Sequence, residues 1–302
     1  MSIAVGGSAP WVGVDGELRP AEEPQLAALE GGASVGWGVF TTGAIRGGRP
    51  LLLARHIERL RGDAFGSRLL AANSQAQAEA WSSGWSEMLA RLIAANRVER
   101  GLFRLTLCAR GEGRWHQNGP PRALLAAVPS DLEAAPLAAW LSPYHLDARR
   151  PLSGIKSTSY APWHLMVAEA GELNCNEALY RDSNGALCEG ARSNLFWRRG
   201  STVLTPALST GCLPGIARAL LCSWLSEPGS PWAGREVRLG AGELRGADEI
   251  FVSSATLGPR PVTLLRTDEG IVWRAAAEGP ACALLRKRWS HDIEQNIAAD
   301  DA

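Results

Sequence analysis

One lysine stands alone in an otherwise uncharged stretch near the middle of the chain. Lys156 is the only charged residue between Arg150 and Glu169, and small polar and apolar residues surround it. Burial lowers the pKa of a lysine and leaves a nucleophilic amine, which Schiff-base chemistry with a carbonyl compound or with pyridoxal phosphate requires. Because isolated lysines are more commonly exposed, a surface lysine on a loop is the alternative interpretation.

Pyridoxal phosphate would make three further demands on this chain. A carboxylate must face the pyridinium nitrogen, the phosphate needs backbone N–H groups and an arginine, and an aromatic or hydroxyl group must hold the ring oxygen. The sequence offers residues for each demand, namely Glu189, the turn at 213–217, Arg59 and Tyr160.

Arg59 falls within a predicted helix. Residues 54–65 carry apolar side chains spaced three and four apart, which is typical of an amphipathic helix, and a second helix is predicted over 75–96. Arg59 lies at the edge of the apolar face. Taken alone, it is a solvated helix arginine.

The first half of the chain also contains β-prone runs. A Gly-Gly pair at 47–48 between two such runs predicts a hairpin. Residues 101–111 read as a strand, and strict alternation places Arg104 and Arg110 on the same face together with the residues between them at 106 and 108. Two arginines on one face suggest a wall that binds carboxylates, and a solvent-exposed face explains them equally well.

The second half predicts a meander of strands. The runs 176–182, 186–190, 193–198 and 202–206 alternate with glycine-containing turns. Glu189 lies inside one of these strands, where an acid is disfavoured by propensity. It is therefore either on a solvated face or functional.

Two later turns could bind a phosphate. A helix beginning near Gly215 would leave the first N–H groups without partners and free for an anion, although most helix starts bind nothing. A predicted strand at 249–252 runs into small residues at 253–258, which could also donate to a phosphate. An ordinary polar turn is the alternative there.

Composition limits the classes of function. The 302 residues include 31 basic and 31 acidic side chains, and this balance gives no support for a nucleic-acid or membrane partner. We find no apolar run of membrane-spanning length and no signal-peptide pattern at the start. The six cysteines are scattered without a Cys-x-x-Cys pair, so no metal site is expected and a reduced cytoplasmic setting fits best.

The length suits two domains. We expect a small N-terminal domain over 1–130, a linker at 131–137, a larger domain over 138–290 and a flexible tail over 291–302. The linker is placed where strand-like segments give way to a Pro-Ser-Asp-Leu-Glu-Ala-Ala-Pro run.

Taken in order, these pieces resemble the class IV (fold type IV) pyridoxal-phosphate enzymes, which include branched-chain and D-amino-acid aminotransferases and aminodeoxychorismate lyase. The resemblance extends from Gly36 to Val262. It is specific because several separated motifs agree. These motifs are Val39-Phe40-Thr41-Thr42, His56-Ile57-Glu58-Arg59-Leu60, Gly154-Ile155-Lys156, Glu189-Gly190 with Ser193-Asn194-Leu195-Phe196, Leu213-Pro214-Gly215-Ile216 and Phe251-Val252-Ser253-Ser254.

The resemblance implies an α+β fold of the D-amino-acid aminotransferase type, with a small N-terminal α/β domain and a larger β-rich domain. It also implies that Lys156 forms the Schiff base with pyridoxal 5'-phosphate and later transfers protons, and that Glu189 pairs with the pyridine nitrogen. Other implied cofactor contacts are Arg59, Tyr160, Leu213, Gly215, Ile216, Ala217, Ser254 and Ala255. Ala217 and Ala255 depart from the hydroxyl residues that many members carry, and backbone donors could survive both changes.

Within the family, the runs at 40–42 and 194–198 and the turn before Pro261 resemble the aminodeoxychorismate lyase branch. The implied reaction releases enolpyruvate from aminodeoxychorismate and yields 4-aminobenzoate and pyruvate, a step of folate biosynthesis. We expect a hydroxyl of Thr41 or Thr42 to assist the leaving group, and Arg110, with Thr42, to bind the substrate. A polar strand face and a solvated arginine are the alternatives.

Two other functions remain open at this stage. An aminotransferase acting on D- or branched-chain amino acids would share every cofactor residue and differ in the fate of the substrate. A non-catalytic protein that retained the fold would be recognised by its failure to bind the cofactor. The family resemblance also implies a homodimer acting on a small-molecule amine or amino acid.

Overall fold

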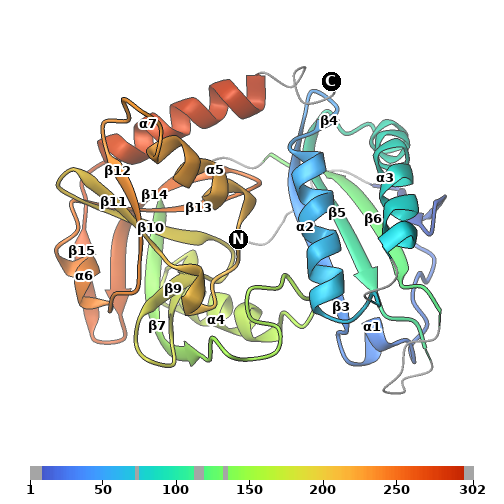
Figure 1. Cartoon of the computed structure of the whole chain (residues 1–302), viewed down its shortest axis with the longest axis horizontal. Coiled ribbons are helices and arrows are strands. Elements are labelled where there is room, and N and C mark those ends of the chain that lie inside the picture. Colours follow the sequence, from blue (N-terminus) through green and yellow to red (C-terminus); the bar gives the residue numbers. More distant parts are fainter. Residues whose placement is uncertain (1–8, 72–74, 112–118, 132–134, 296–302) are drawn as a thin grey trace. The chain divides into compact units, whose positions relative to one another are not determined.

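The computed structural model describes residues 9–71, 75–111, 119–131 and 135–295, which fold into two compact units (Figure 1). Unit 1 consists of the described parts of Met1–Leu132 together with Ile155–Tyr160. Unit 2 consists of the described parts of Glu133–Gly154 and Ala161–Gln295. None of the helices in the described residues combines the length and apolar character that a membrane span requires.

Unit 1 is built on an antiparallel sheet. Its six described strands lie in the order β2 (Glu17–Pro20), β1 (Trp11–Val14), β6 (Arg122–Pro129), β5 (Arg100–Cys108), β3 (Gly38–Arg46) and β4 (Arg49–Pro50). The predicted hairpin at 47–48 is confirmed, because it joins β3 to β4 and both of its glycines have positive φ. Along β3 and β5, successive side chains point to opposite faces of this sheet, so odd-numbered and even-numbered residues of these two strands lie on different faces.

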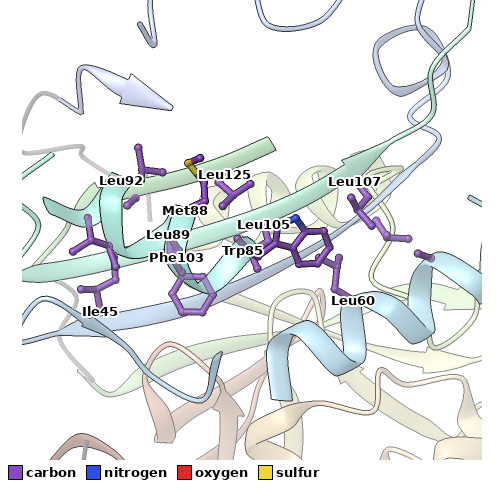
Figure 2. Close-up of a cluster of buried hydrophobic side chains, with 14 of the residues drawn as sticks. Ile45, Leu60, Trp85, Met88, Leu89, Leu92, Phe103, Leu105, Leu107 and Leu125 are labelled. Carbon is purple, nitrogen blue, oxygen red and sulfur yellow. The ribbon is translucent and has the colours of Figure 1, made fainter. Parts of the chain in front are cut away.

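One face of the sheet is covered by helices α2 (Leu53–Gly66) and α3 (Gln75–Ala95), and both predicted helices are confirmed. Odd-numbered residues of β3 and β5 meet these helices in a continuous apolar core. Figure 2 shows its large side chains, among them Leu60, Leu89, Leu92, Phe103 and Leu105. Burying one such side chain contributes about 1.5–3 kcal/mol, so this cluster fixes α2, and with it Arg59, against the sheet. A short helix, α1 (Gly31–Ser34), precedes β3.

The segment carrying Lys156 packs within unit 1, although the expected domain boundaries assign it to the second domain. Ser157 forms an isolated antiparallel bridge with Val39, Phe40 N–H donates to the Lys156 carbonyl at 2.9 Å, and Thr158 N–H donates to the Gly38 carbonyl at 2.8 Å. Because β5 pairs with one edge of β3, this segment must occupy the other edge. Ile155 packs against the apolar core and anchors the segment.

Unit 2 contains a larger mixed sheet. Its nine described strands include eight in the order β12 (Ala233–Val237), β11 (Thr202–Pro206), β10 (Asn194–Arg199), β13 (Glu249–Ser254), β14 (Gly258–Thr267), β7 (Leu137–Leu146), β8 (Glu177–Asp182) and β9 (Leu187–Gly190), with β15 (Gly270–Arg274) beside β14. The pairs β14–β7, β7–β8 and β11–β12 are parallel, and the others are antiparallel.

Helices complete the two apolar layers of unit 2. These are α4 (Ala161–Glu172), α5 (Ile216–Leu225), α6 (Gly242–Arg245) and α7 (Pro280–Trp289), with a 3-10 turn η1 (Leu208–Thr210) and a π-helical turn η2 (Ser290–Gln295). The core containing Trp197 includes residues of α6, whereas the core containing Tyr180 includes residues of α4. A flexible tail was expected from residue 291, but the chain continues to Gln295 as the helical turn η2. An ion pair between Arg288 and Asp292 at 2.9 Å stabilises this turn.

Several elements differ from the predictions. Strands β7, β12, β14 and β15 were not predicted, because their residues lack clear alternation or contain proline. The strand predicted over 101–111 is β5, which ends at Cys108.

Candidate active site

The amine of Lys156 lies among aromatic rings in unit 1. Its Nζ is 4.6 Å from the centre of the Phe40 ring and 5.2 Å from the centre of the Tyr160 ring. These two rings meet edge to face at 5.4 Å. The side chain is half-buried. Cation–π contact of this kind stabilises and orients an ammonium group, so the two rings hold the Lys156 amine beside them.

A buried acid lies close to the same lysine. Asp63 on α2 accepts a long hydrogen bond of 3.4 Å from the Lys156 backbone N–H. Burial raises the pKa of the Asp63 carboxyl to about 6, although Arg59, that hydrogen bond and Lys156 act in the opposite direction. Asp63 was not among the predicted site residues. The signal in the sequence was an acid three residues after Leu60 and next to Ala64, on the predicted apolar face of the helix.

Arg59 is also half-buried, and its guanidinium is only partly used by the protein. Its Nη2 donates to Thr41 Oγ1 at 2.7 Å, whereas its Nε is buried and has no partner among the described residues. Burial lowers the pKa of Arg59, yet arginine stays charged in proteins. A buried cation with an unused donor is suited to an anionic ligand.

The two predicted threonines of β3 point to opposite sides. Thr41 is fully buried, and its Oγ1 lies 2.5 Å from His56 Nδ1 as well as near Arg59. Thr42 is half-buried, shares the other face of the strand with Phe40, and lies opposite Arg104 on β5. The Thr42 hydroxyl therefore lies on the same face as the aromatic ring that contacts Lys156.

The two arginines considered for a substrate carboxylate have different surroundings. Arg104 is exposed, and its Cζ lies 3.7 Å above the centre of the Phe40 ring, the same ring that Lys156 contacts. Arg110 lies beyond the end of β5 and forms an ion pair with Asp15. The strand ends two residues before Arg110, so the common face predicted for the two arginines stays a prediction. The ion pair with Asp15 distinguishes the surroundings of Arg110 from those of Arg104.

Glu189 is held by three hydrogen-bond donors in unit 2. Its Oε1 accepts from the Tyr180 hydroxyl at 2.6 Å, and its Oε2 accepts from Leu213 N–H at 3.0 Å and from Asn194 Nδ2 at 3.2 Å. Burial and the neighbouring carboxylate raise the pKa of Tyr180 well above its usual value, so the phenol remains a donor. The carboxylate of Glu189 is therefore fixed in orientation while it stays buried.

Asn194 links Glu189 to the start of α5. Its Nδ2 also donates to the Leu213 carbonyl at 2.9 Å, and a Cβ atom at Gly215 would lie only 2.0 Å from its Oδ1. Gly215 is the N-cap of α5, and no side chain caps this helix in the described structure. The N–H groups of Ile216 and Ala217 thus remain the unpaired donors of a helix N-terminus. Asn194 belongs to one of the family motifs, but no site role was predicted for it.

The turn after β13 contributes further small residues to unit 2. Ser253 lies opposite Asn194 in the β10–β13 pairing, and its buried Oγ has no partner among the described residues. Ser254 Oγ lies 3.2 Å from Thr256 Oγ1, and Ala255 follows Ser254 in the turn. The predicted residues therefore form two groups, one in each unit. In unit 1 these are Lys156, Arg59, Tyr160, Thr41 and Thr42, and in unit 2 they are Glu189, Leu213, Gly215, Ile216, Ala217, Ser254 and Ala255.

Comparison with known proteins identifies the class of this chain. The family described as Amino-transferase class IV matches residues 38–265, and the chain belongs to this family. It is an enzyme of the pyridoxal-phosphate-dependent type, a lyase or an aminotransferase. The predicted two-domain α+β fold of fold type IV is confirmed by solved structures of relatives.

Individual relatives include both kinds of enzyme. Aminodeoxychorismate lyase of Bacillus subtilis (strain 168) is 27% identical over 294 residues, which cover 94% of this chain and 95% of that protein. The solved structure of 4-amino-4-deoxychorismate lyase from Pseudomonas aeruginosa is 26% identical, has a TM-score of 0.74, and matches over 93% of this chain and 98% of that one.

The branched-chain aminotransferases match in a different way. That of Escherichia coli (strain K12) is 31% identical over 137 residues, which cover 45% of this chain and 43% of that protein. A solved structure of the Escherichia coli enzyme has a TM-score of 0.81 at 21% identity and covers 94% of both chains. This second likeness concerns the fold.

Proposed function

We propose that this chain is a pyridoxal-phosphate-dependent 4-amino-4-deoxychorismate lyase, which forms 4-aminobenzoate and pyruvate. The observation that carries this choice is the extent of the similarity to the Bacillus subtilis lyase, which spans 94% of the chain, whereas the aminotransferase of Escherichia coli matches 45%. The arrangement of amine, hydroxyl and guanidinium groups around Phe40 supports it.

Each group, taken by itself, carries residues whose chemistry suits this cofactor. The unused Nε of Arg59 and the N–H groups of Ile216 and Ala217 suit its phosphate, with the turn at Ser254 and Ala255 as further donors. Glu189 suits the pyridine nitrogen, Tyr160 the ring oxygen, and the Lys156 amine the aldehyde. The Leu213 N–H group holds Glu189 in place. Gly215, which has no side chain, allows the loop to lie close to Asn194.

When bound, the cofactor stores the electrons released as the substrate loses a proton. Lys156 Nζ takes that proton from the ring carbon of the substrate, acting as the general base. The Thr42 hydroxyl donates a hydrogen bond to the leaving enolpyruvate oxygen. Thr41 is unsuited to that task, because its hydroxyl is engaged by His56 and Arg59. Arg104 replaces Arg110 as the residue that binds a substrate carboxylate, because it adjoins Phe40 and Arg110 is paired with Asp15.

The proposal is tested by incubating the purified holoenzyme with aminodeoxychorismate and measuring pyruvate and 4-aminobenzoate. We expect both products in equal amounts from the wild-type protein and none above background from Lys156→Ala, because the base and the cofactor anchor are lost together. Absence of both products from a yellow, cofactor-loaded wild-type protein would exclude the lyase.

An aminotransferase is the second candidate, which the 31% identity to the Escherichia coli enzyme favours. Branched-chain and D-amino acids should then convert the yellow cofactor to its colourless pyridoxamine form, whereas a lyase should leave the spectrum unchanged. A protein that stays colourless after addition of pyridoxal phosphate would instead be a non-catalytic member of the fold.

A further inference from the structure

Thr41 in unit 1 connects a buried histidine to Arg59. Its Oγ1 is 2.5 Å from His56 Nδ1 on α2 and 2.7 Å from Arg59 Nη2 on the same helix. Thr41 and His56 are both completely buried. A single hydroxyl on β3 therefore ties the histidine ring and the guanidinium together.

The direction of these hydrogen bonds follows from the chemistry of the three groups. A guanidinium only donates, so Thr41 Oγ1 accepts from Arg59. Burial, together with the nearby charges of Arg59 and Lys156, lowers the pKa of His56 to about 3, so the ring is neutral. Within the described residues, His56 Nδ1 is the acceptor found for the Thr41 hydroxyl hydrogen. The bonds thus run from Arg59 through Thr41 to His56, whose proton is on Nε2.

The position of the His56 ring is tightly restricted. It packs edge to face against Phe103 with ring centres 5.1 Å apart. A Cβ atom at Gly43 would lie 2.4 Å from Phe103 Cζ and 2.8 Å from His56 Nε2, so glycine is required for the ring to pack against β3. His56 Nε2 has no partner among the described residues, and an unpaired buried polar atom costs stability. An aliphatic side chain would avoid this cost, which argues that the ring is present for its contact with Thr41.

We propose that Thr41 and His56 are positioning residues that hold the Arg59 guanidinium in place for the phosphate of the cofactor. The inference rests on the proposed function, which assigns Arg59 to that phosphate. Thr41 engages Nη2 and leaves Arg59 Nε for the anion. Fixing an arginine before the ligand arrives reduces the side-chain entropy that binding would otherwise lose.

The test compares the affinity of the cofactor-free protein for pyridoxal phosphate and for pyridoxal, which lacks the phosphate. Quenching of the fluorescence of its 12 tryptophans reports both dissociation constants. The ratio of the two affinities isolates the contribution of the phosphate. We expect Thr41→Val to lower this preference about tenfold and Thr41→Ser to keep it within about twofold, because serine retains the hydroxyl. His56→Leu should resemble Thr41→Val, and the double variant should lose no more, because both residues act in one chain of bonds.

Thr205→Val serves as a matched control. It removes an equally buried hydroxyl that donates to the Leu195 carbonyl at 2.8 Å in unit 2, and it should leave the phosphate preference unchanged. Thermal unfolding of each variant separates local effects from loss of folding. A folded Thr41→Val protein with the wild-type preference overturns the positioning role.

Arg59→Met separates this inference from the proposed function. A reduced phosphate preference in Arg59→Met with an unchanged preference in Thr41→Val rejects only the positioning role. An unchanged preference in Arg59→Met rejects the assignment of Arg59 to the phosphate, and the positioning role with it.

Discussion

The carboxyl group of Asp63 is buried close to two cations, Arg59 and Lys156. Burial has the larger effect, so the pKa of this group in the folded protein is about 6, compared with 3.8 for an ordinary aspartate. Between these two pH values the folded protein keeps a proton that the unfolded chain has lost. Stability must therefore decrease as the pH rises through this window.

We expect Asp63→Asn to remove this dependence. The free energy of unfolding of the wild-type protein should fall relative to that of Asp63→Asn by about 2 kcal/mol between pH 4 and pH 7, because the variant has no proton to lose there. Urea unfolding of both cofactor-free proteins at several pH values measures the difference, and all other titrations cancel in the comparison. A difference that stays constant over this range would show that Asp63 titrates normally.

The roles of Arg104 and Arg110 can be distinguished directly. A charge-assisted bond to a carboxylate is worth about 1.5–3 kcal/mol, so Arg104→Gln should lower kcat/KM for the lyase reaction about 10- to 100-fold. Arg110→Gln should change it less than about threefold, because Arg110 is occupied by Asp15 and exposed ion pairs contribute little. Steady-state assays measure both variants. A large loss in Arg110→Gln with a small one in Arg104→Gln would identify Arg110 as the residue that binds the substrate carboxylate.

At the scale of elements, the start of α5 depends on one glycine. Gly215 is in extended conformation and lies against Asn194, which also holds Glu189 and the Leu213 carbonyl. The loop before the helix and the carboxylate on β9 are thus held by the same side chain. A change at Gly215 is expected to affect both.

We expect Gly215→Ala to destabilise the protein by about 1–3 kcal/mol and to weaken cofactor binding, because the new methyl group would overlap the Asn194 amide. Gly171→Ala is the control. This glycine lies in α4 with open space around it, so alanine should be neutral or stabilise by about 0.5–1 kcal/mol. Thermal unfolding and cofactor titration measure both variants, and equal behaviour of the two would contradict the role given to Asn194.

At the scale of the whole molecule, residues far apart in the sequence come together within each unit. Lys156 follows Arg59 by nearly a hundred positions, yet the segment Ile155–Tyr160 adds to the edge of β3 and packs in unit 1. In unit 2, Asn194 lies next to Leu213 although a strand and a turn separate them. Within unit 1, this arrangement explains how a lysine and an arginine that no local pattern connects come to lie in the same unit.

The sequence alone determined the α+β class, the family and the helices that carry Arg59 and the start of α5, because periodicity, glycine turns and separated motifs are local signals. It also predicted Lys156 and Glu189 as cofactor-binding residues. Only the tertiary structure revealed the contacts of Asp63, His56 and Asn194. It also showed that Thr41 bonds to Arg59 and that Arg110 pairs with Asp15. The physical reason is that burial and side-chain pairing depend on contacts between strands and helices that are distant in sequence, and the local sequence carries no signal for them.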